Sequence, residues 1–218
     1  MACDNCNPGR LIPGKLIKVN KFGPDMACSV CGDKITMRDN YFQEKQRRWD
    51  TYFYLICKAV ATKSPCLSRR IGAALVRDNS IISTGYNGPP RGVPHCGHNR
   101  YMEDDSLVIG KSINPEVSIE TIKTTCPRRI MGIKSGEGMQ WCPAQHAEEN
   151  AVSNAARNGV SVINTVLYMN SVIPCQKCFG TLINAGVVEI VIESKTTYDI
   201  HTKFLIDNSK IKIREFTL

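Results

Sequence analysis

Eleven of the 218 residues are cysteines, and their spacing limits the folds that this chain can adopt. Six of them form three C-x-x-C pairs, namely Cys3 with Cys6, Cys28 with Cys31, and Cys175 with Cys178. A C-x-x-C turn places two thiolates on one side of a tight loop, so each pair can supply half of a tetrahedral zinc site. Because the sequence shows no export signal, we expect a reducing, cytoplasmic location and metal ligands rather than a disulfide framework.

The first two pairs lie about twenty residues apart, a spacing typical of four-sulfur structural zinc sites. The segment has too little apolar content to fold without a metal. We therefore predict a zinc-ribbon-like module over 1–39, with one structural zinc. Its predicted ligands are Cys3, Cys6, Cys28 and Cys31. The alternative is a chance set of pairs in an unstructured tail.

Composition limits the remaining possibilities. Hydrophobic residues make up 42% of the chain and charged residues 22%, as in globular proteins. No run approaches the ~18 consecutive apolar residues of a membrane helix, so no membrane partner is expected. The net charge of +8 attracts phosphate-bearing partners, from nucleotides to nucleic acids, although it also suits an ordinary solvated surface.

Residues 40–218 read as one α/β domain. Apolar residues recur at helical spacing over 41–63, and Trp49, Tyr52, Phe53, Ile56 and Val60 mark the face expected to be buried, with Cys57 in the core. The pattern then predicts strands at 71–76, 81–86, 165–169, 187–193 and 211–216, and helices at 146–158, 175–185 and 200–207. A hairpin followed by strand–helix alternation predicts a mixed five-stranded sheet with helices on both faces, a three-layer α-β-α architecture. A polar insertion at about 97–125 interrupts this pattern and suits a lid or a metal-pinned loop.

The most informative residues begin two of the predicted helices. His146 begins one helix, and Cys175 and Cys178 begin the other, so an imidazole and two thiolates can meet on one zinc ion. Three protein ligands leave a fourth position for water, whose pKa zinc lowers to about 7. Glu148 follows the imidazole by two residues, where it can move a proton from the water to a leaving nitrogen. The alternative is a further structural zinc site or a chance match.

The motifs H-x-E and P-C-x-x-C are typical of zinc-dependent nucleobase deaminases. Because it carries both motifs, the sequence resembles the cytidine and deoxycytidylate deaminase superfamily. The segments 66–76, 85–96 and 126–137 look like its deoxycytidylate branch, and the resemblance covers about 52–216. The implied fold is the cytidine-deaminase-like fold, and the implied reaction converts dCMP and water into dUMP and ammonia. Also implied are substrate contacts by Asn87, by the backbone of Ala147 and by Tyr198.

The resemblance further implies a homo-oligomer with dCTP and dTTP as effectors, which would bring Mg²⁺ with them. It also implies a second structural zinc, for which the candidate ligands are Cys66, Cys96, Cys126 and Cys142. His95 and His98 compete as ligands, and free buried cysteines are the alternative. The N-terminal module and the insertion depart from the family's simplest form.

Two questions stay open at the level of the sequence. Several arginines near the matched segments could bind a substrate phosphate, and nothing ranks Arg69, Arg70, Arg91, Arg128 and Arg129. The substrate class also has alternatives. Residues 1–48 hold 9 Lys/Arg against 5 Asp/Glu, which favours nucleic-acid binding through this module and deamination of a base within RNA or DNA. A zinc-ribbon binding protein with an inactive deaminase body is the third possibility.

Overall fold

The computed structural model describes residues 26–27, 34–35, 37–97, 100, 104, 116–134, 137–197 and 200–218. The chain divides into two units, Met1–Asp50 and Thr51–Leu218. In the first unit, strands β1 (Met26–Ala27) and β2 (Lys34–Ile35) pair antiparallel. The four cysteines predicted to hold the N-terminal zinc lie outside the described residues, so that module stays a prediction.

A mixed five-stranded sheet forms the centre of the second unit, as the sequence predicts. Its strands are β3 (Gly72–Arg77), β4 (Ser80–Tyr86), β5 (Val166–Met169), β6 (Glu189–Ile192) and β7 (Lys212–Glu215). Their order in the sheet is β4-β3-β5-β6-β7. The β3–β4 and β3–β5 pairs are antiparallel, whereas β5–β6 and β6–β7 are parallel.

The hairpin between β3 and β4 turns through two residues. Asp78 and Asn79 have φ angles of 51° and 57°, and the flanking Arg77 and Ser80 pair directly. Two consecutive positive φ angles are typical of a type I′ turn, and Asp and Asn tolerate this conformation better than most residues. The turn sets the pairing next to it, Arg77 with Ser80 and Val76 with Ile81, and the register then shifts between Val76 and Leu75.

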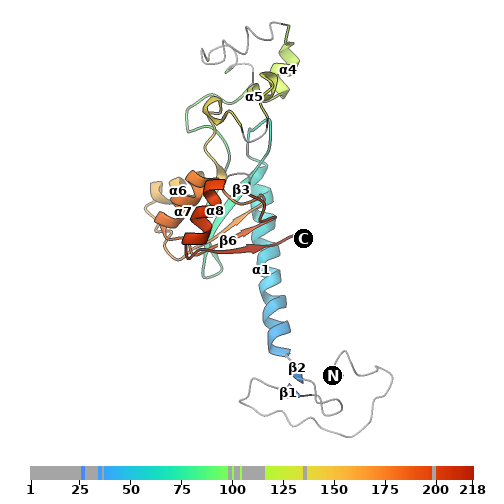
Figure 1. The fold of residues 1–218 in the computed structure, drawn as a ribbon, viewed down its shortest axis with the longest axis vertical. Helices are drawn as coiled ribbons and strands as arrows, with labels where there is room; N and C mark the ends of the chain where they lie inside the picture. Colours follow the sequence, from blue (N-terminus) through green and yellow to red (C-terminus); the bar gives the residue numbers. More distant parts are fainter. Residues whose placement is uncertain are drawn as a thin grey trace, which may run out of the picture. The chain divides into compact units, whose positions relative to one another are not determined.

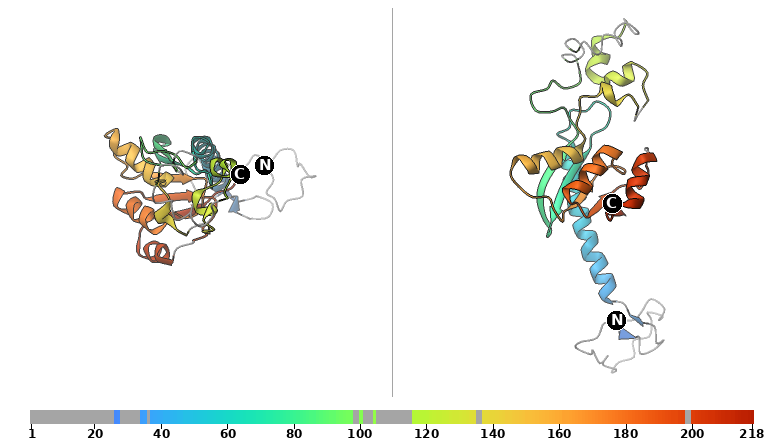
Figure 2. Two further views of the ribbon diagram at one scale, coloured as in Figure 1. Left: turned by 90° about the horizontal axis from the view of Figure 1, so that it is seen from above. Right: turned by 60° about the vertical axis from the view of Figure 1, so that its left-hand side comes forward.

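Helices cover both faces of the sheet. Helices α6 (Ala147–Arg157), α7 (Gln176–Ala185) and α8 (Ile200–Asn208) lie on one face (Figures 1 and 2). Alternate strand residues, including Leu75, Leu167 and Ile190, point into the core beneath these helices. On the other face, the second-unit part of helix α1 (Met37–Ala61) packs its Phe53 ring on Tyr168, with ring centroids 5.0 Å apart. The three-layer architecture is thereby confirmed.

One residue of the helix face that was predicted to be buried is exposed. Phe53 and Cys57 are buried as expected, but the side chain of Tyr52 is 50% exposed. The buried positions of α1 follow a stripe through Phe53, Cys57 and Ala61, each four residues after the last, and Tyr52 lies beside that stripe. The expectation that Tyr52 belongs to the core was therefore wrong.

The region before His146 holds short helices that the sequence analysis did not assign. They are α4 (Ile119–Thr124), α5 (Pro127–Ile130) and the 3₁₀-helix η2 (Met139–Trp141). Ile122 is buried in a small apolar cluster there, to which Trp141 also belongs. None of the described helices combines the length and hydrophobicity required to span a bilayer.

Candidate active site

Two helix N-termini meet at the site. His146 is the N-cap of α6, and its backbone N–H donates to the carboxylate of Glu149 in a capping box. Cys175 is the N-cap of α7, which follows β5. The positive end of each helix dipole therefore faces the two thiols and the imidazole, which favours thiolates there.

A glycine allows α6 to approach the sheet this closely. A Cβ atom added to Gly85 of β4 would lie 2.2 Å from the carbonyl oxygen of Ala147 and 2.3 Å from the backbone nitrogen of Ala151. Any side chain at this position would push the first turns of α6 away from β4. The lack of a side chain at Gly85 therefore allows the start of α6, which carries His146 and Glu148, to lie this close to β4.

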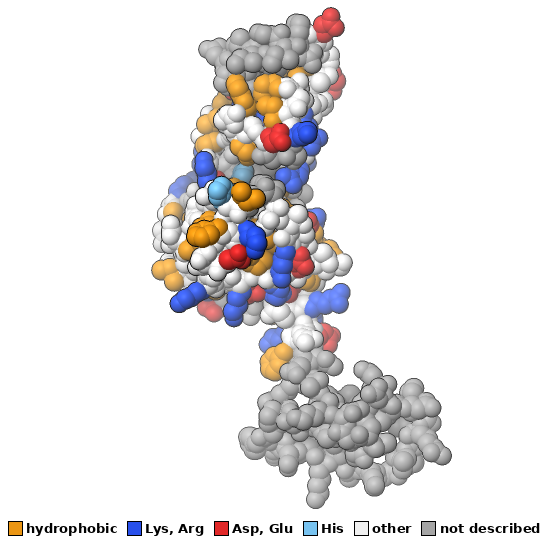
Figure 3. Space-filling view, in the orientation of Figure 1, with side chains coloured by type: hydrophobic (Ala, Val, Ile, Leu, Met, Phe, Trp, Pro, Cys, Tyr) orange, Lys and Arg blue, Asp and Glu red, His pale blue; other side chains and the backbone are white. Residues whose placement is uncertain are grey.

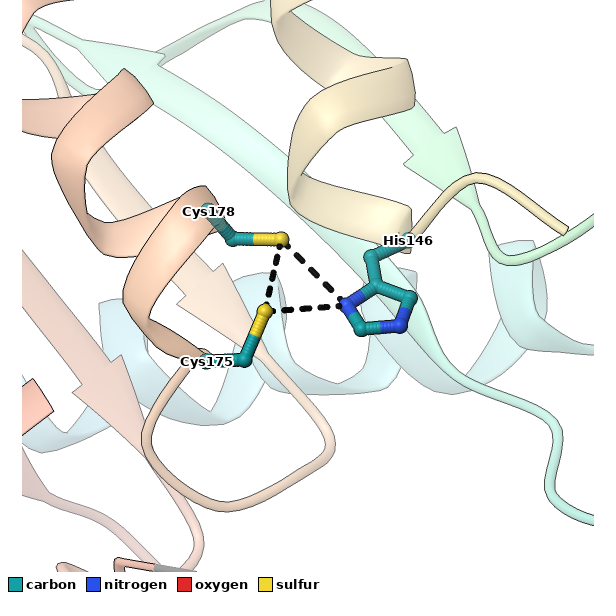
Figure 4. A group of neighbouring side chains, drawn as sticks. All are labelled: His146, Cys175 and Cys178. Atoms are coloured by element: carbon teal, nitrogen blue, oxygen red, sulfur yellow. Dashed lines mark hydrogen bonds between the residues drawn. The ribbon is translucent and has the colours of Figure 1, made fainter. Parts of the chain in front are cut away.

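The side chains of His146, Cys175 and Cys178 converge on one point (Figure 4). The Nδ1 atom of His146 lies 3.5 Å from the Cys175 sulfur and 3.3 Å from the Cys178 sulfur, and the two sulfurs are 3.4 Å apart. Tetrahedral zinc with bonds of ~2.3 Å to sulfur and ~2.0–2.1 Å to nitrogen places such atoms about 3.5–3.8 Å apart. The donor set and its spacing therefore fit zinc, with a slight expansion on binding.

Within the described part of the chain, no other His, Cys, Asp and Glu side chains bring three ligand atoms within 4.8 Å of one another. The protonation of this set reflects its contacts. A hydrogen bond from the Cys178 thiol and the proximity of His146 lower the pKa of Cys175 to about 4. The same thiol–thiolate bond, together with burial, raises the pKa of Cys178, and the hydrogen bond with Cys175 raises that of His146 to about 9. These contacts favour a thiolate at Cys175. Because metal ligands bind in their deprotonated forms, binding of zinc here would be coupled to release of protons.

Glu148 lies beside this set without belonging to it. Its carboxylate oxygen Oε1 lies 3.8 Å from Nδ1 of His146, and only 4% of the residue is exposed. Burial raises the pKa of the Glu148 carboxyl group above its ordinary value. A buried carboxyl group with a raised pKa, next to a metal site, is suited to accept and return a proton.

A cavity of about 710 Å³ opens over these residues. This volume falls in the range of sites for small organic ligands. Besides the metal set and Glu148, the wall includes Asn87 and Ala147, both predicted to contact substrate. The third predicted contact, Tyr198, lies outside the described residues.

The Asn87 amide already holds the loop that precedes β3. Its Oδ1 accepts hydrogen bonds from the backbone N–H of Ile71 and the hydroxyl of Ser64, both at 2.8 Å. Its Nδ2 donates to the carbonyl of Arg69 at 2.8 Å, which leaves one amide hydrogen for a ligand. Sequence reasoning missed Ser64, whose hydroxyl also donates to the Asn87 carbonyl, because an isolated serine gives no sequence signal.

The four cysteines proposed for a second structural zinc, all among the described residues, are not brought together within 4.8 Å of one another. Burial raises the pKa of the Cys96 thiol, and Cys126 and Cys142 lie near enough to raise it further, while Arg100 opposes them. Cys66 lines the large cavity, as does Cys142. His95 is exposed, and His98 lies outside the described residues.

Comparisons with known proteins show the family of this chain. A family profile described as the cytidine and deoxycytidylate deaminase zinc-binding region matches residues 47–194. A deoxycytidylate deaminase of Schizosaccharomyces pombe is 31% identical over 168 residues, which make up 77% of this chain and 44% of that protein. One of Mycobacterium phage D29 is 30% identical over 148 residues, which are 66% of this chain and 92% of that protein. The chain thus spans less than half the length of the yeast relative.

A solved structure shares the fold. The apo crystal structure of dCMP deaminase from the cyanophage S-TIM5 superposes with a TM-score of 0.52 at 16% sequence identity, and the match covers 78% of this chain and 98% of that one. At this identity the likeness concerns the fold alone.

Proposed function

This chain belongs to the cytidine and deoxycytidylate deaminase family, and from this premise we propose that it deaminates dCMP hydrolytically, giving dUMP and ammonia. The observation that carries the proposal is the convergence of His146, Cys175 and Cys178 beside the buried carboxyl group of Glu148. Three ligands of this kind leave one position of a tetrahedral ion open, as catalytic sites require.

Different residues of the chain bind the metal, transfer the proton and orient the substrate. When bound by His146, Cys175 and Cys178, zinc lowers the pKa of a water molecule and so makes a nucleophile available at neutral pH. Glu148 accepts the proton that this water gives up and returns a proton to the amino nitrogen that leaves C4 of the base. The backbone of Ala147 and the free amide hydrogen of Asn87 orient the pyrimidine and its sugar along the cavity wall.

An ammonia-release assay on four substrates tests the proposal. The zinc-loaded protein should release ammonia from dCMP faster than from dCTP, cytidine or a tRNA anticodon stem-loop. The expected order follows from the deoxycytidylate deaminases that match the chain. Turnover confined to the stem-loop would instead assign the protein to polymer deamination, and turnover of none would indicate an inactive deaminase body.

The proposal includes further zinc sites. We assign one structural zinc to Cys3, Cys6, Cys28 and Cys31, and a second to the segments that hold Cys66, Cys96, Cys126 and Cys142. The spacing of the first set supports the former, and the nearness of Cys126 and Cys142 to Cys96 supports the latter. Elemental analysis should then find about three zinc ions per chain, whereas one ion would remove both structural sites.

Regulation and partners also belong to the proposal. The family resemblance favours a cytoplasmic homo-oligomer that responds to dCTP and dTTP, with Mg²⁺ accompanying the nucleotide. Nucleic-acid binding through the N-terminal module rests on its basic charge. On the face seen in Figure 3, lysine and arginine side chains of the described residues are interspersed with acidic ones. Light scattering with and without dCTP and dTTP tests the oligomer and its effectors together.

A further inference from the structure

Arg128 connects the region before His146 to the metal site. It lies in helix α5, which begins directly after Cys126, and its side chain is half-buried. The cavity that contains His146, Glu148 and Cys178 is also lined by Arg128. A residue of α5, just after the insertion, and the metal ligands therefore share one cavity.

The Arg128 guanidinium is anchored at one nitrogen and lacks a hydrogen-bond partner at another. Its Nη1 donates to the carbonyl of Glu137 and lies 3.2 Å from the Met139 sulfur. Its Nε is buried and is the one buried side-chain nitrogen or oxygen, among the described residues, without a hydrogen-bond partner. A buried N–H without an acceptor is costly, so its presence at a ligand cavity suggests an acceptor that arrives with the ligand.

The edge of this guanidinium that carries Nε and Nη2 has the geometry to bind a phosphate group. Nε and Nη2 point the same way and can donate two parallel hydrogen bonds to two oxygens of one phosphate. The Nη1 contacts fix the plane of the group in advance, so little side-chain freedom is lost when a ligand binds.

The other cationic candidates are less well placed. Arg70, Arg91 and Arg129 do not line the cavity, and Arg91 donates to the side chain of Asn154. Arg69 and Lys177 do line it, but both are exposed, so solvent screens their charges. The structure thus ranks arginines that the sequence could not rank.

We propose that Arg128 binds the phosphate monoester of the substrate and so distinguishes the nucleotide from its nucleoside. This inference rests on the proposed function and deepens it. Helix α5 then has a role in specificity, because it carries the guanidinium to a site whose metal ligands lie at the starts of α6 and α7.

Steady-state kinetics of two matched variants test the assignment, with no other nucleotide present. Arg128→Gln should raise the KM for dCMP about ten- to hundredfold, as expected when a charged hydrogen-bonding group is lost. It should change kcat for dCMP much less. Its kcat/KM for deoxycytidine, which has no phosphate, should fall far less than that for dCMP. Arg129→Gln removes the same charge from the next, exposed residue and should leave the KM for dCMP unchanged.

Three results would overturn the assignment. The first is an unchanged KM for dCMP in Arg128→Gln, which would also be the result if this guanidinium took the phosphate of an effector instead. The second is an equal loss with deoxycytidine, and the third an equal loss in Arg129→Gln. Arg128→Lys, which keeps the charge, should recover part of the affinity, and zinc content with thermal unfolding should match the wild type in each variant. Wild-type protein that releases no ammonia from dCMP would contradict the proposed function itself.

Discussion

The carboxylate oxygen Oε1 of Glu148 lies 3.8 Å from the Nδ1 atom of His146, the nitrogen that faces both cysteine sulfurs. This distance is too long for a hydrogen bond. The Glu148 carboxylate does not belong to the group of ligand atoms that lie within 4.8 Å of one another, so it lies next to the metal position without being part of the ligand set. Glu148 is therefore available for proton transfer.

Glu148→Gln should retain zinc and lose activity. The amide keeps the size of the side chain but cannot accept and return a proton, so kcat should fall by about 10²- to 10⁴-fold. Zinc content per chain, measured on the same sample as the ammonia-release rate, checks this. Glu149→Gln is the matched control, because Gln also serves at this position of a capping box. It should keep most of the activity, and equal losses in both variants would contradict a specific role for Glu148.

Gly85→Ala should destabilise the protein and slow the reaction. The added methyl group would overlap the backbone of Ala147, so the start of α6 must move. We expect a loss of about 1–3 kcal/mol in the free energy of unfolding, as for overpacked cores, and a lower kcat. Urea unfolding and steady-state kinetics measure the two effects.

Gly180→Ala provides the control for that substitution. Gly180 lies inside α7, and nothing lies within 4 Å of the position of its added Cβ. The same change should therefore stabilise the protein, by about 0.5–1 kcal/mol, since Ala favours helix. If Gly85→Ala also left the free energy of unfolding undiminished, the close approach of α6 to β4 would be contradicted.

Cys178→Ser should lose one zinc ion per chain and nearly all activity, because it removes one of three sulfur and nitrogen ligands. Cys57→Ala is the comparison. Cys57 is also fully buried, but it lies in α1, where its thiol donates to the carbonyl of Tyr168. Elemental analysis should find unchanged zinc in Cys57→Ala, and a loss of zinc there would mean that the metal count reports folding rather than ligation.

Asn87→Ala should loosen the loop before β3. It leaves the part-buried Ile71 N–H and Arg69 carbonyl without their partner, and loss of a typical hydrogen bond costs about 0.5–1.5 kcal/mol. Asn87→Asp keeps the acceptor for Ile71 and Ser64 and should lose less stability. Chemical denaturation of both variants measures the difference in the free energy of unfolding. An Asn87→Ala variant of wild-type stability would contradict the claim that the Asn87 amide holds this loop.

Much of this structure could be predicted from local sequence patterns. The hairpin turn at Asp78 and Asn79 and the helix starts at His146 and Cys175 carry short-range signals, and all were predicted to within a few residues. The convergence of His146 with Cys175 and Cys178 was also expected, because three ligands of that type at two helix starts suit one ion.

The features that the sequence did not predict depend on contacts between distant segments. Tyr52 and Phe53 are neighbouring aromatic residues of one helix, and the structure shows that Phe53 is the one that packs on Tyr168 and is buried. Arg128 and Arg129 are equivalent in sequence, yet α5 directs one to the cavity and leaves the other exposed. A single sequence carries no signal for either choice.

The central claim is that this chain deaminates dCMP with zinc held by His146, Cys175 and Cys178. Its most direct test is the formation of dUMP from dCMP before metal removal, after chelation, and after return of zinc sufficient for all three proposed sites. We predict that dUMP and ammonia form in equal amounts, that chelation abolishes both, and that zinc restores them. Turnover that persists in the metal-free protein, or none in the zinc-loaded protein, would contradict the claim.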